Sequence, residues 1–284
     1  MRHRALILEQ APASGLGGID PGGTRDIGHD VAEQRLAHAR DKLAEIQTKM
    51  KASETWALLA IFQGMDAAGK DSTIAHVFRG LDPGALRVTS FKRPSIVESA
   101  HDILWREHQA VPQAGQWGVF NRSHYENLLV PRVHPERGPS PHLPASLRGP
   151  DMRRGQLEDI VHFERMLSRN GVKICKFFMH ISREEQRRRL LARLDDPHKA
   201  WKFEASDLTE RQRWDAYQLA YHDVIAATAT PFAPWAIIPA NSKPVARAIV
   251  AEILVDQLSN LDIAVPLPDA EILRNARQAL RNPL

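Results

Sequence analysis

The sequence predicts an α/β protein in which one parallel sheet carries helices on both faces. Short apolar runs alternate along the chain with longer segments of helical periodicity, and this alternation is typical of βαβ units. Each run is apolar at consecutive positions, as expected for a strand that is buried on both faces. A glycine-rich segment ending in Gly-Lys follows the first run directly. Open parallel sheets bind their ligands there, beyond the carboxyl ends of the strands.

The elements of this fold are predicted in order along the chain. The apolar runs expected to form the five strands are 56–62, 86–91, 116–120, 172–181 and 235–239. The amphipathic segments expected to form helices are 31–51, 72–79, 95–108, 156–169, 183–193, 209–227 and 244–258. Residues 1–30 are expected to be a flexible N-terminal tail. Residues 31–284 are expected to form one domain, with 134–150 as a surface excursion rich in proline and glycine.

The composition is that of an ordinary globular protein. Of the 284 residues, 43% are hydrophobic and 25% charged, which excludes wholesale disorder. No apolar run approaches the roughly 18 residues of a membrane span, so no membrane partner is expected. The single cysteine, Cys175, excludes an intramolecular disulfide and a Cys-rich zinc site, and it favours a cytoplasmic location. The net charge of +4 favours anionic partners.

A phosphate-binding loop is predicted after the first strand. Residues 64–73 read Gly-Met-Asp-Ala-Ala-Gly-Lys-Asp-Ser-Thr between a predicted strand and a predicted helix. Backbone N–H groups of such a loop surround phosphate oxygens, and Lys70 adds a point charge. The residues predicted to bind phosphate here are Gly64, Ala67, Ala68, Gly69, Asp71, Ser72 and Thr73. The loop refines the fold class to a P-loop kinase-like three-layer sandwich; a glycine-rich turn with a solvated lysine is the alternative.

Asp66 is unusual inside such a loop. A carboxylate among phosphates needs a cation between them, so Asp66 is predicted to bind Mg²⁺. The alternative is that Asp66 only stabilises the turn, since aspartate favours turns. The position after Lys70 is ordinarily a serine or threonine that binds Mg²⁺, but this chain has Asp71.

Polar residues follow the next two strands. Phosphate-loop enzymes commonly place a metal-organising residue at the end of a neighbouring strand, and here Asn121 and Arg122 follow the third strand. An arginine at that place is able to hold phosphoryl oxygens with two hydrogen bonds. Alternatively, Ser123 and Glu126 only form a capping box at the start of a helix. Lys92, after the second strand, lies beside the phosphate loop if the two strands are neighbours, or otherwise in a solvated basic turn.

A helical lid is predicted at about 183–208. The helix after the fourth strand is rich in arginine, and Arg189 and Arg193 are four residues apart, on one face. A lid of this kind closes over a transferring phosphate, expels water and neutralises charge. A solvated charged helix is the alternative.

Several of these segments together resemble the polyphosphate kinase 2 family, which transfers phosphoryl groups between inorganic polyphosphate and nucleotides. Residues 64–71 resemble its Walker A segment, 120–126 its Walker B segment, and 194–203 its lid motif. The similarity runs over 31–258 and includes Phe-Glu-Arg-Met-Leu at 163–167 and Ala-Pro-Trp at 233–235. The excursion at 134–150 resembles the family less, and a basic residue expected near Ala75 is absent.

The resemblance implies a Mg²⁺-dependent kinase, with Mn²⁺ as a substitute, that phosphorylates AMP and ADP from polyphosphate to give ADP and ATP. It implies that the catalytic residues are Asp66, Lys70, Asn121, Arg122, Glu126 and Arg193. Asp66, Asn121 and Glu126 are the implied metal ligands, Lys199 and Lys202 belong to the lid, and Lys92 lies along the polyphosphate track. Members that act on ADP alone carry Asp in place of Asn121 and Asn in place of Glu126. A homo-oligomer is also expected.

Three other functions are weighed against this one. The same core suits an ATP-dependent kinase of small molecules, or polyphosphate synthesis from a nucleoside triphosphate in the reverse direction. The positive net charge also suits a nucleic-acid-binding protein. Nucleic acid is not expected as a partner, because the basic residues gather around a phosphate loop and the sequence shows no motif of a nucleic-acid-binding module.

Overall fold

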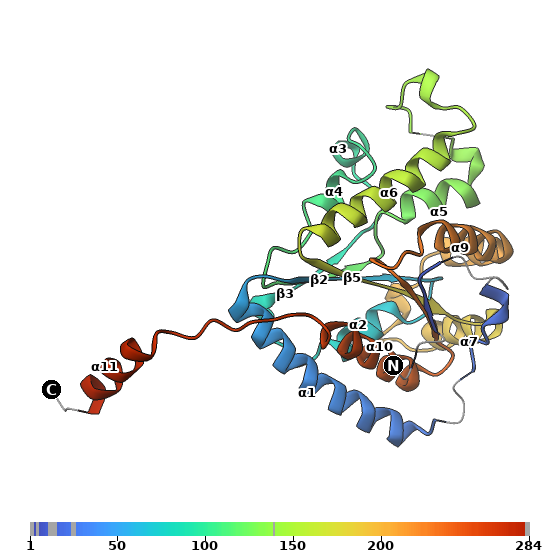
Figure 1. Cartoon of the computed structure of the whole chain (residues 1–284). Helices are drawn as coiled ribbons and strands as arrows, with labels where there is room; N and C mark the ends of the chain where they lie inside the picture. Colours follow the sequence, from blue (N-terminus) through green and yellow to red (C-terminus); the bar gives the residue numbers. More distant parts are fainter. Residues whose placement is uncertain (1–2, 4–5, 11–15, 24–26, 139, 282–284) are drawn as a thin grey trace.

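The computed structural model describes residues 3, 6–10, 16–23, 27–138 and 140–281, and its sheet has the strand order β1-β6-β5-β2-β4-β3 (Figure 1). The strands are β1 (Ile7–Leu8), β2 (Ala57–Gln63), β3 (Leu86–Ser90), β4 (Trp117–Asn121), β5 (Val172–His180) and β6 (Trp235–Pro239). Strands β2 to β6 pair in parallel. They confirm the predicted five-stranded parallel sheet and the α/β class. A sixth strand, β1, was not predicted.

The N-terminal stretch contributes this sixth strand. Ile7 and Leu8 pair antiparallel with Ala236 and Trp235 of β6, and Leu16 is only 4% exposed. The His180 ring lies 3.0 Å from the carbonyl oxygen of Ile19. These segments cover apolar surface at the edge of the sheet, so they belong to the sheet and core rather than to the expected flexible tail. Residues 1–2, 4–5, 11–15 and 24–26 of that tail lie outside the described residues.

Helices cover both faces of the sheet (Figure 1). One face carries α1 (His29–Ser53), α2 (Lys70–Val77) and α10 (Lys243–Leu258); the other carries α5 (Glu126–Val133), α6 (Met152–Arg169) and α9 (Trp214–Thr228). The remaining helices are α3 (Ile96–Ser99), α4 (Trp105–His108), α7 (Arg183–Leu194), α8 (Ser206–Gln212) and α11 (Ala270–Arg281). Short 3-10 turns lie at Leu16–Gly18, Pro83–Ala85, Pro135–Arg137, Ala145–Leu147 and Ala200–Lys202.

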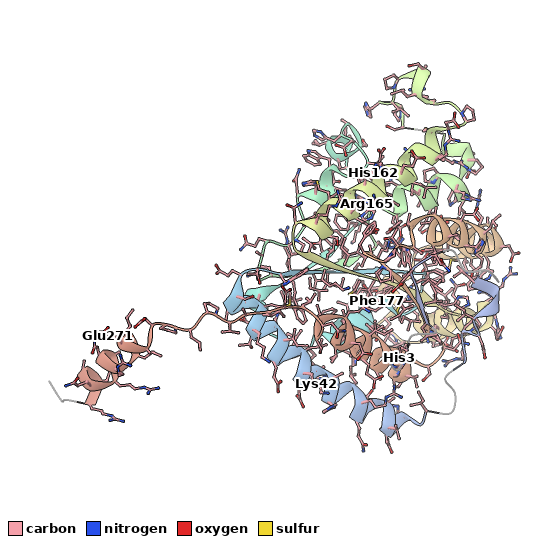
Figure 2. All side chains as sticks on the ribbon, in the orientation of Figure 1. His3, Lys42, His162, Arg165, Phe177 and Glu271 are labelled. Atoms are coloured by element: carbon pink, nitrogen blue, oxygen red, sulfur yellow. The ribbon has the colours of Figure 1, made fainter. Side chains whose placement is uncertain are left out.

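The core lies between these layers. Every residue of β2 is buried, which explains its uninterrupted apolar run. Figure 2 shows Phe177 of β5 in the middle layer, where it stacks on Phe62 with ring centroids 5.0 Å apart. The same view shows Lys42 on α1, below the sheet, and His162 on α6, above it. The three layers that the sequence predicts are therefore present.

Two predicted helices are divided in the structure. The segment 95–108 forms α3 and α4, because the Asp102 carboxylate accepts a hydrogen bond from the Leu104 N–H (2.8 Å) and offers the backbone a turn. The segment 209–227 forms parts of α8 and α9, which are separated at Arg213. Helix α11 was not predicted, and α5 was considered only in the alternative in which Ser123 and Glu126 lie at the start of a helix. In Figure 1, α11 stands apart from the layers at the end of an extended segment, and all of its residues are exposed.

A buried ionic cluster joins β5 to the segment that follows β4. The Nζ atom of Lys176 lies 2.6 Å from Glu164 Oε2 and donates to the carbonyl oxygen of Thr228 (2.8 Å). The Tyr125 hydroxyl donates to Glu164 Oε1 (2.6 Å). Burial alone would raise the pKa of Glu164, but the Lys176 ammonium and the His124 ring hold it below its ordinary value. The cluster fixes Tyr125, which immediately precedes α5.

We expect Lys176→Met to lower the free energy of unfolding by about 3–5 kcal/mol, because it leaves the Glu164 carboxylate buried without its ammonium partner. Urea denaturation measures this loss. Lys176→Met combined with Glu164→Leu should lose less, since no charge is then left unpaired. Lys42→Met, at an exposed lysine, is the control and should stay within about 0.5 kcal/mol of the parent. A loss below about 1 kcal/mol for Lys176→Met would contradict this role.

Candidate active site

A cleft of about 1760 Å³ opens beyond the carboxyl ends of the parallel strands. β2 pairs with β4 on one side and β5 on the other, so the chain leaves β2 at a point where the strand order reverses. Ligands of α/β sheets bind at such points. The predicted site residues that line the cleft are Asp66, Ala67, Gly69, Lys70, Asp71, Ser72, Lys92, Asn121, Arg122, Glu126, Arg193, Lys199 and Lys202. Gly64, Ala68 and Thr73 lie in the phosphate loop and helix α2 without lining it.

The backbone of the phosphate loop adopts positive φ angles at its two glycines, Gly64 and Gly69. Gly64 has φ +148°, and a Cβ atom there would lie 2.8 Å from the carbonyl oxygen of Met179. Gly69 has φ +101° and directly precedes α2. Ala67 also has a positive φ, 60°, which a residue with a side chain rarely adopts. The loop therefore turns tightly and brings the first N–H groups of α2, which have no partner within the helix, to the cleft.

Lys70 is buried beneath this loop. Its ammonium group donates to the carbonyl oxygens of Gly64 (2.6 Å) and Met65 (3.2 Å). Burial, followed by the nearby Arg122, lowers the pKa of Lys70 to about 8, although neighbouring carboxylates oppose this shift. A bound phosphate would add further negative charge next to the buried ammonium group of Lys70. Lys70 is thus placed to hold a phosphoryl group.

Helix α7 braces the loop from behind. Arg189 is 7% exposed and donates to the carbonyl oxygens of Ala67 (3.1 Å) and Ala68 (3.0 Å). Gln186 donates from Nε2 to the carbonyl oxygen of Asp66 (3.0 Å). The sequence places Arg189 with Arg193 on one face of a lid helix, and both line the cleft. Arg189 is tied to the loop backbone by these hydrogen bonds, whereas Arg193 pairs with Asp207.

Arg122 connects the phosphate loop to the segment after β4. Its guanidinium donates to Asp66 Oδ1 (2.6 Å) and to Glu126 Oε2 (3.3 Å). Glu126, followed by Asp66, raises the pKa of Arg122 above its ordinary value against the effect of burial. The Arg122 backbone has φ +64°, which turns the side chain back over the loop. One guanidinium therefore lies between two carboxylates at the floor of the cleft.

The capping box considered for Ser123 and Glu126 is not formed. Helix α5 begins at Glu126 with Tyr125 as its preceding residue and without a side-chain cap. The Ser123 hydroxyl instead accepts a hydrogen bond from the Tyr125 N–H (3.3 Å). The Glu126 carboxylate is turned towards Arg122 and is available for the chemistry of the cleft.

The carboxylates around Arg122 fit a magnesium ion. Asp66, Asp71 and Glu126 all line the cleft and offer the oxygen ligands that Mg²⁺ prefers. Asn121 donates from Nδ2 to Asp71 Oδ1 (2.6 Å), so its amide orients Asp71. Among the described residues, no three His, Cys, Asp or Glu side chains are grouped closely enough to hold a metal by themselves. Mg²⁺ is usually bound in proteins through one or two carboxylates together with substrate phosphates.

The predicted lid residues Arg193, Lys199 and Lys202 also line the cleft. Arg193 donates to Asp207 Oδ2 of α8 (3.2 Å) and to the carbonyl oxygen of Lys202 (3.4 Å). Burial, with Asp66 adding to it, raises the pKa of Asp207. The Lys199 ammonium pairs with Asp196. Arg193 and both lysines face the cleft, as a lid over phosphates requires, and Asp207 holds Arg193 in this arrangement.

Lys92 lines the cleft, although the strand that it follows is not a neighbour of the strand before the phosphate loop. β3 is not a neighbour of β2, because β4 lies between them. Even so, Lys92 and Arg93 both line the cleft. The carbonyl oxygen of Lys92 accepts a hydrogen bond from Arg106 (2.8 Å), which holds this turn in place. The side chains of Lys92 and Arg93 are both exposed, so this basic turn is solvated and also lines the cleft.

A model of the family described as Polyphosphate kinase 2 matches residues 26–265. The chain belongs to the polyphosphate kinase 2 family. It is therefore a phosphotransferase, as its phosphate loop and the charged cleft predict. No helix in the described part of the chain is long and apolar enough to cross a membrane.

Individual relatives cover most of the chain. An ADP-polyphosphate phosphotransferase of Rhodopseudomonas palustris is 43% identical over 80% of this chain and 78% of its own length. An AMP/ADP-polyphosphate phosphotransferase of Meiothermus ruber is 43% identical over 85% of this chain and 86% of its own. The crystal structure of a polyphosphate kinase 2 from Arthrobacter aurescens TC1 superposes with a TM-score of 0.88 at 36% identity, covering 98% of this chain and 96% of that one.

Three side chains of this kinase site were missed by the sequence analysis. Gln186 and Asp207 belong to charged helical segments, where nothing in the pattern distinguishes them from solvated residues. Gln63 carries a signal that was overlooked, because it is a polar residue that ends an apolar strand directly before the phosphate loop.

We expect Lys70→Ala and Asp66→Ala each to lower kcat at least about 10²-fold, because each removes a preorganised charge from the site of transfer. Steady-state assays with a nucleotide, Mg²⁺ and polyphosphate measure this loss, and circular dichroism checks the fold. Lys42→Ala, on the outer face of α1, is the matched control. Near-normal turnover by a folded Lys70→Ala variant would contradict the assignment of the phosphate loop.

We expect Arg193→Ala to lower kcat by about tenfold or more with little change in KM, because a lid arginine acts mainly on the charge of the transition state. Arg187→Ala is the matched control on the same helix, since Arg187 pairs with Glu184 at the surface. Kinetics that match those of the control would make Arg193 a structural partner of Asp207 only.

Proposed function

We propose that this kinase transfers phosphoryl groups from inorganic polyphosphate to AMP and ADP, giving ADP and ATP. The observation that carries the proposal is Arg122, held between Asp66 and Glu126 beside the phosphate loop. This arrangement offers two carboxylates and one guanidinium where two phosphate-bearing substrates meet. The relatives named for ADP and for AMP with ADP are equally identical to this chain, so the acceptor depends on local residues.

The walls of the cleft support polyphosphate as the donor. Cationic side chains line it well beyond the phosphate loop: Lys92, Arg93, Arg153, Arg188, Lys199, Lys202 and Lys243. A linear polyanion has charge at every unit and benefits from such a series, whereas a nucleoside triphosphate needs cations at one end only. Ala75, where the family resemblance suggests a basic residue, lines the same cleft as Lys243 and Arg188.

Phosphoryl transfer in this site needs positioning and charge neutralisation more than a covalent nucleophile. The attacking group is an oxygen of the nucleotide's terminal phosphate, whose second pKa is about 6, so it is ionised at neutral pH and needs no general base. Its bond to the terminal phosphorus of polyphosphate forms as the phosphoanhydride bond breaks, and the shortened polyphosphate leaves. Lys70 and the N-terminus of α2 hold the transferring group while Arg193 closes over it.

Arg122 changes partners during this cycle. Without substrate, Asp66 and Glu126 neutralise its charge. Phosphate oxygens are equally good bidentate partners for a guanidinium, so Arg122 turns to the transferring group and leaves the two carboxylates free. Those carboxylates, with Asn121 and Asp71 beside them, are the residues that would hold Mg²⁺, and Mn²⁺ as a substitute. When bound, the ion supplies the positive charge that separates carboxylates from phosphates.

A single assay separates this function from its alternatives. The protein is incubated with AMP or ADP, Mg²⁺ and polyphosphate, without ATP. Formation of ADP and ATP supports the proposal, and no nucleotide turnover refutes it. Turnover that requires added ATP and a small-molecule acceptor would select the ATP-dependent kinase, and polyphosphate made from ATP would show the reverse direction. The homo-oligomer and the cytoplasmic location stay predictions.

We expect Asn121→Asp combined with Glu126→Asn to lower AMP phosphorylation at least about tenfold more than ADP phosphorylation. The exchange moves the carboxylate from position 126, where a shorter nucleotide must be aligned, to position 121 beside Asp71. The kcat/KM values for AMP and ADP, measured separately with polyphosphate, give the ratio. Glu158→Asn, at an exposed position of α6, is the control. Equal losses on both nucleotides would assign the pair to general catalysis or folding.

A further inference from the structure

Gln63 is a fully buried polar residue that the mechanism above does not use. It is the last residue of β2 and is 0% exposed. The register that pairs Phe62 with Asn121 places Gln63 beside the segment that carries Arg122 and Ser123. Gln63 therefore lies between the phosphate loop, which starts at the next residue, and the segment after β4.

The neighbours of Gln63 determine which way its amide points. The Ser123 hydroxyl accepts a hydrogen bond from the Tyr125 N–H (3.3 Å) and has its own proton left to donate. When the amide oxygen of Gln63 faces Ser123, it accepts from the Ser123 N–H (3.2 Å) and hydroxyl (3.1 Å). The amide nitrogen then donates to Glu126 Oε1 over 2.9 Å. In this orientation the amide oxygen faces donors and the amide nitrogen faces an acceptor.

The Glu126 carboxylate is consequently held from two sides. Gln63 donates to Oε1, and Arg122 donates to Oε2 over 3.3 Å. Arg122 is 40% exposed and must turn to phosphate during transfer, whereas Gln63 is enclosed in the sheet. The hydrogen bond from Gln63 is therefore the one that persists when substrate enters.

We propose that Gln63 is a positioning residue that fixes Glu126 and thereby sets the preference of the site for AMP. The inference rests on the proposed function, because it assigns Glu126 the alignment of the shorter nucleotide. A neutral amide is required at this position. A carboxyl group there would face the Glu126 carboxylate at hydrogen-bond distance, and the two charges would repel unless one carried a proton.

The test compares Gln63→Met with the parent. Methionine has a similar size and no donor, so the variant removes the hydrogen bond to Glu126 with little loss of packing. We expect kcat/KM for AMP to fall about tenfold or more, and kcat/KM for ADP to change less than about threefold. In a double-mutant cycle, Gln63→Met should add nothing further in the background of Glu126→Asn, because Gln63 acts through Glu126.

Gln47→Met is the matched control. Gln47 is a buried glutamine of α1 that exchanges hydrogen bonds with the backbone of Asp82. Neither residue lines the cleft. Its loss should lower stability and leave the ratio of AMP to ADP activity unchanged. A change of ratio confined to Gln63→Met therefore separates positioning from a general effect on the fold.

A second variant, Gln63→Glu, keeps the size and hydrogen-bonding geometry of glutamine if the methionine variant does not fold. The introduced carboxyl group faces the Glu126 carboxylate in place of a donor, so kcat/KM for AMP should again fall more than kcat/KM for ADP. A role in packing alone would not change this ratio, because glutamate has the size of glutamine.

The outcomes distinguish the inference from the function on which it rests. A parent enzyme without AMP activity refutes the proposed acceptor. A parent active on AMP, with the same ratio in Gln63→Met or in Gln63→Glu, overturns the role of Gln63 alone. Additive losses in the double-mutant cycle also overturn it, because they would show that Gln63 acts independently of Glu126.

Discussion

The ion pairs of Arg122 with Asp66 and Glu126 are the contact on which the site depends. They connect the loop after β2 to the segment after β4, two neighbouring parallel strands whose carboxyl ends meet at one edge of the sheet. Arg122 adopts a positive φ there, a conformation that persists only when its surroundings hold it. Its N–H donates to the carbonyl oxygen of Phe62 over 3.0 Å, so β2 itself fixes the turn. The positive charge of Arg122 is thus balanced by carboxylates of the protein until a phosphate binds.

Both segments are supported from behind by buried polar contacts. Arg189 holds the carbonyl oxygens of the phosphate loop, and the cluster of Lys176, Glu164 and Tyr125 holds the segment that leads into α5. Groups held in this way keep their orientation when water leaves the cleft, which is the condition for electrostatic stabilisation of a transferring phosphoryl group. The side of each segment that faces the cleft stays open to substrate.

The same framework serves relatives with different nucleotide acceptors. Relatives named for ADP and for AMP with ADP match this chain at 43% identity each, so overall similarity does not indicate which acceptor this chain uses. We propose that the difference arises from charges beside the phosphates. Glu126 is such a charge, and its place depends on Arg122 and on the buried amide of Gln63. In this proposal, the residue that sets specificity lies inside the sheet, behind the residue that meets the substrate.

The sequence by itself determined the parallel sheet, because strands buried on both faces must be apolar throughout, and it located the phosphate loop, because that loop requires Gly64, Gly69 and Lys70 in order. It also predicted Asp66, Arg122 and Glu126. Only the tertiary structure decided that Ile7 and Leu8 extend the sheet, because a strand of two residues is too short to show a hydrophobic pattern in the sequence. It likewise decided that Arg189 braces the loop while Arg193 faces the cleft, and that Gln63 holds Glu126. These roles depend on which atoms meet across elements distant in sequence, and no local pattern records that.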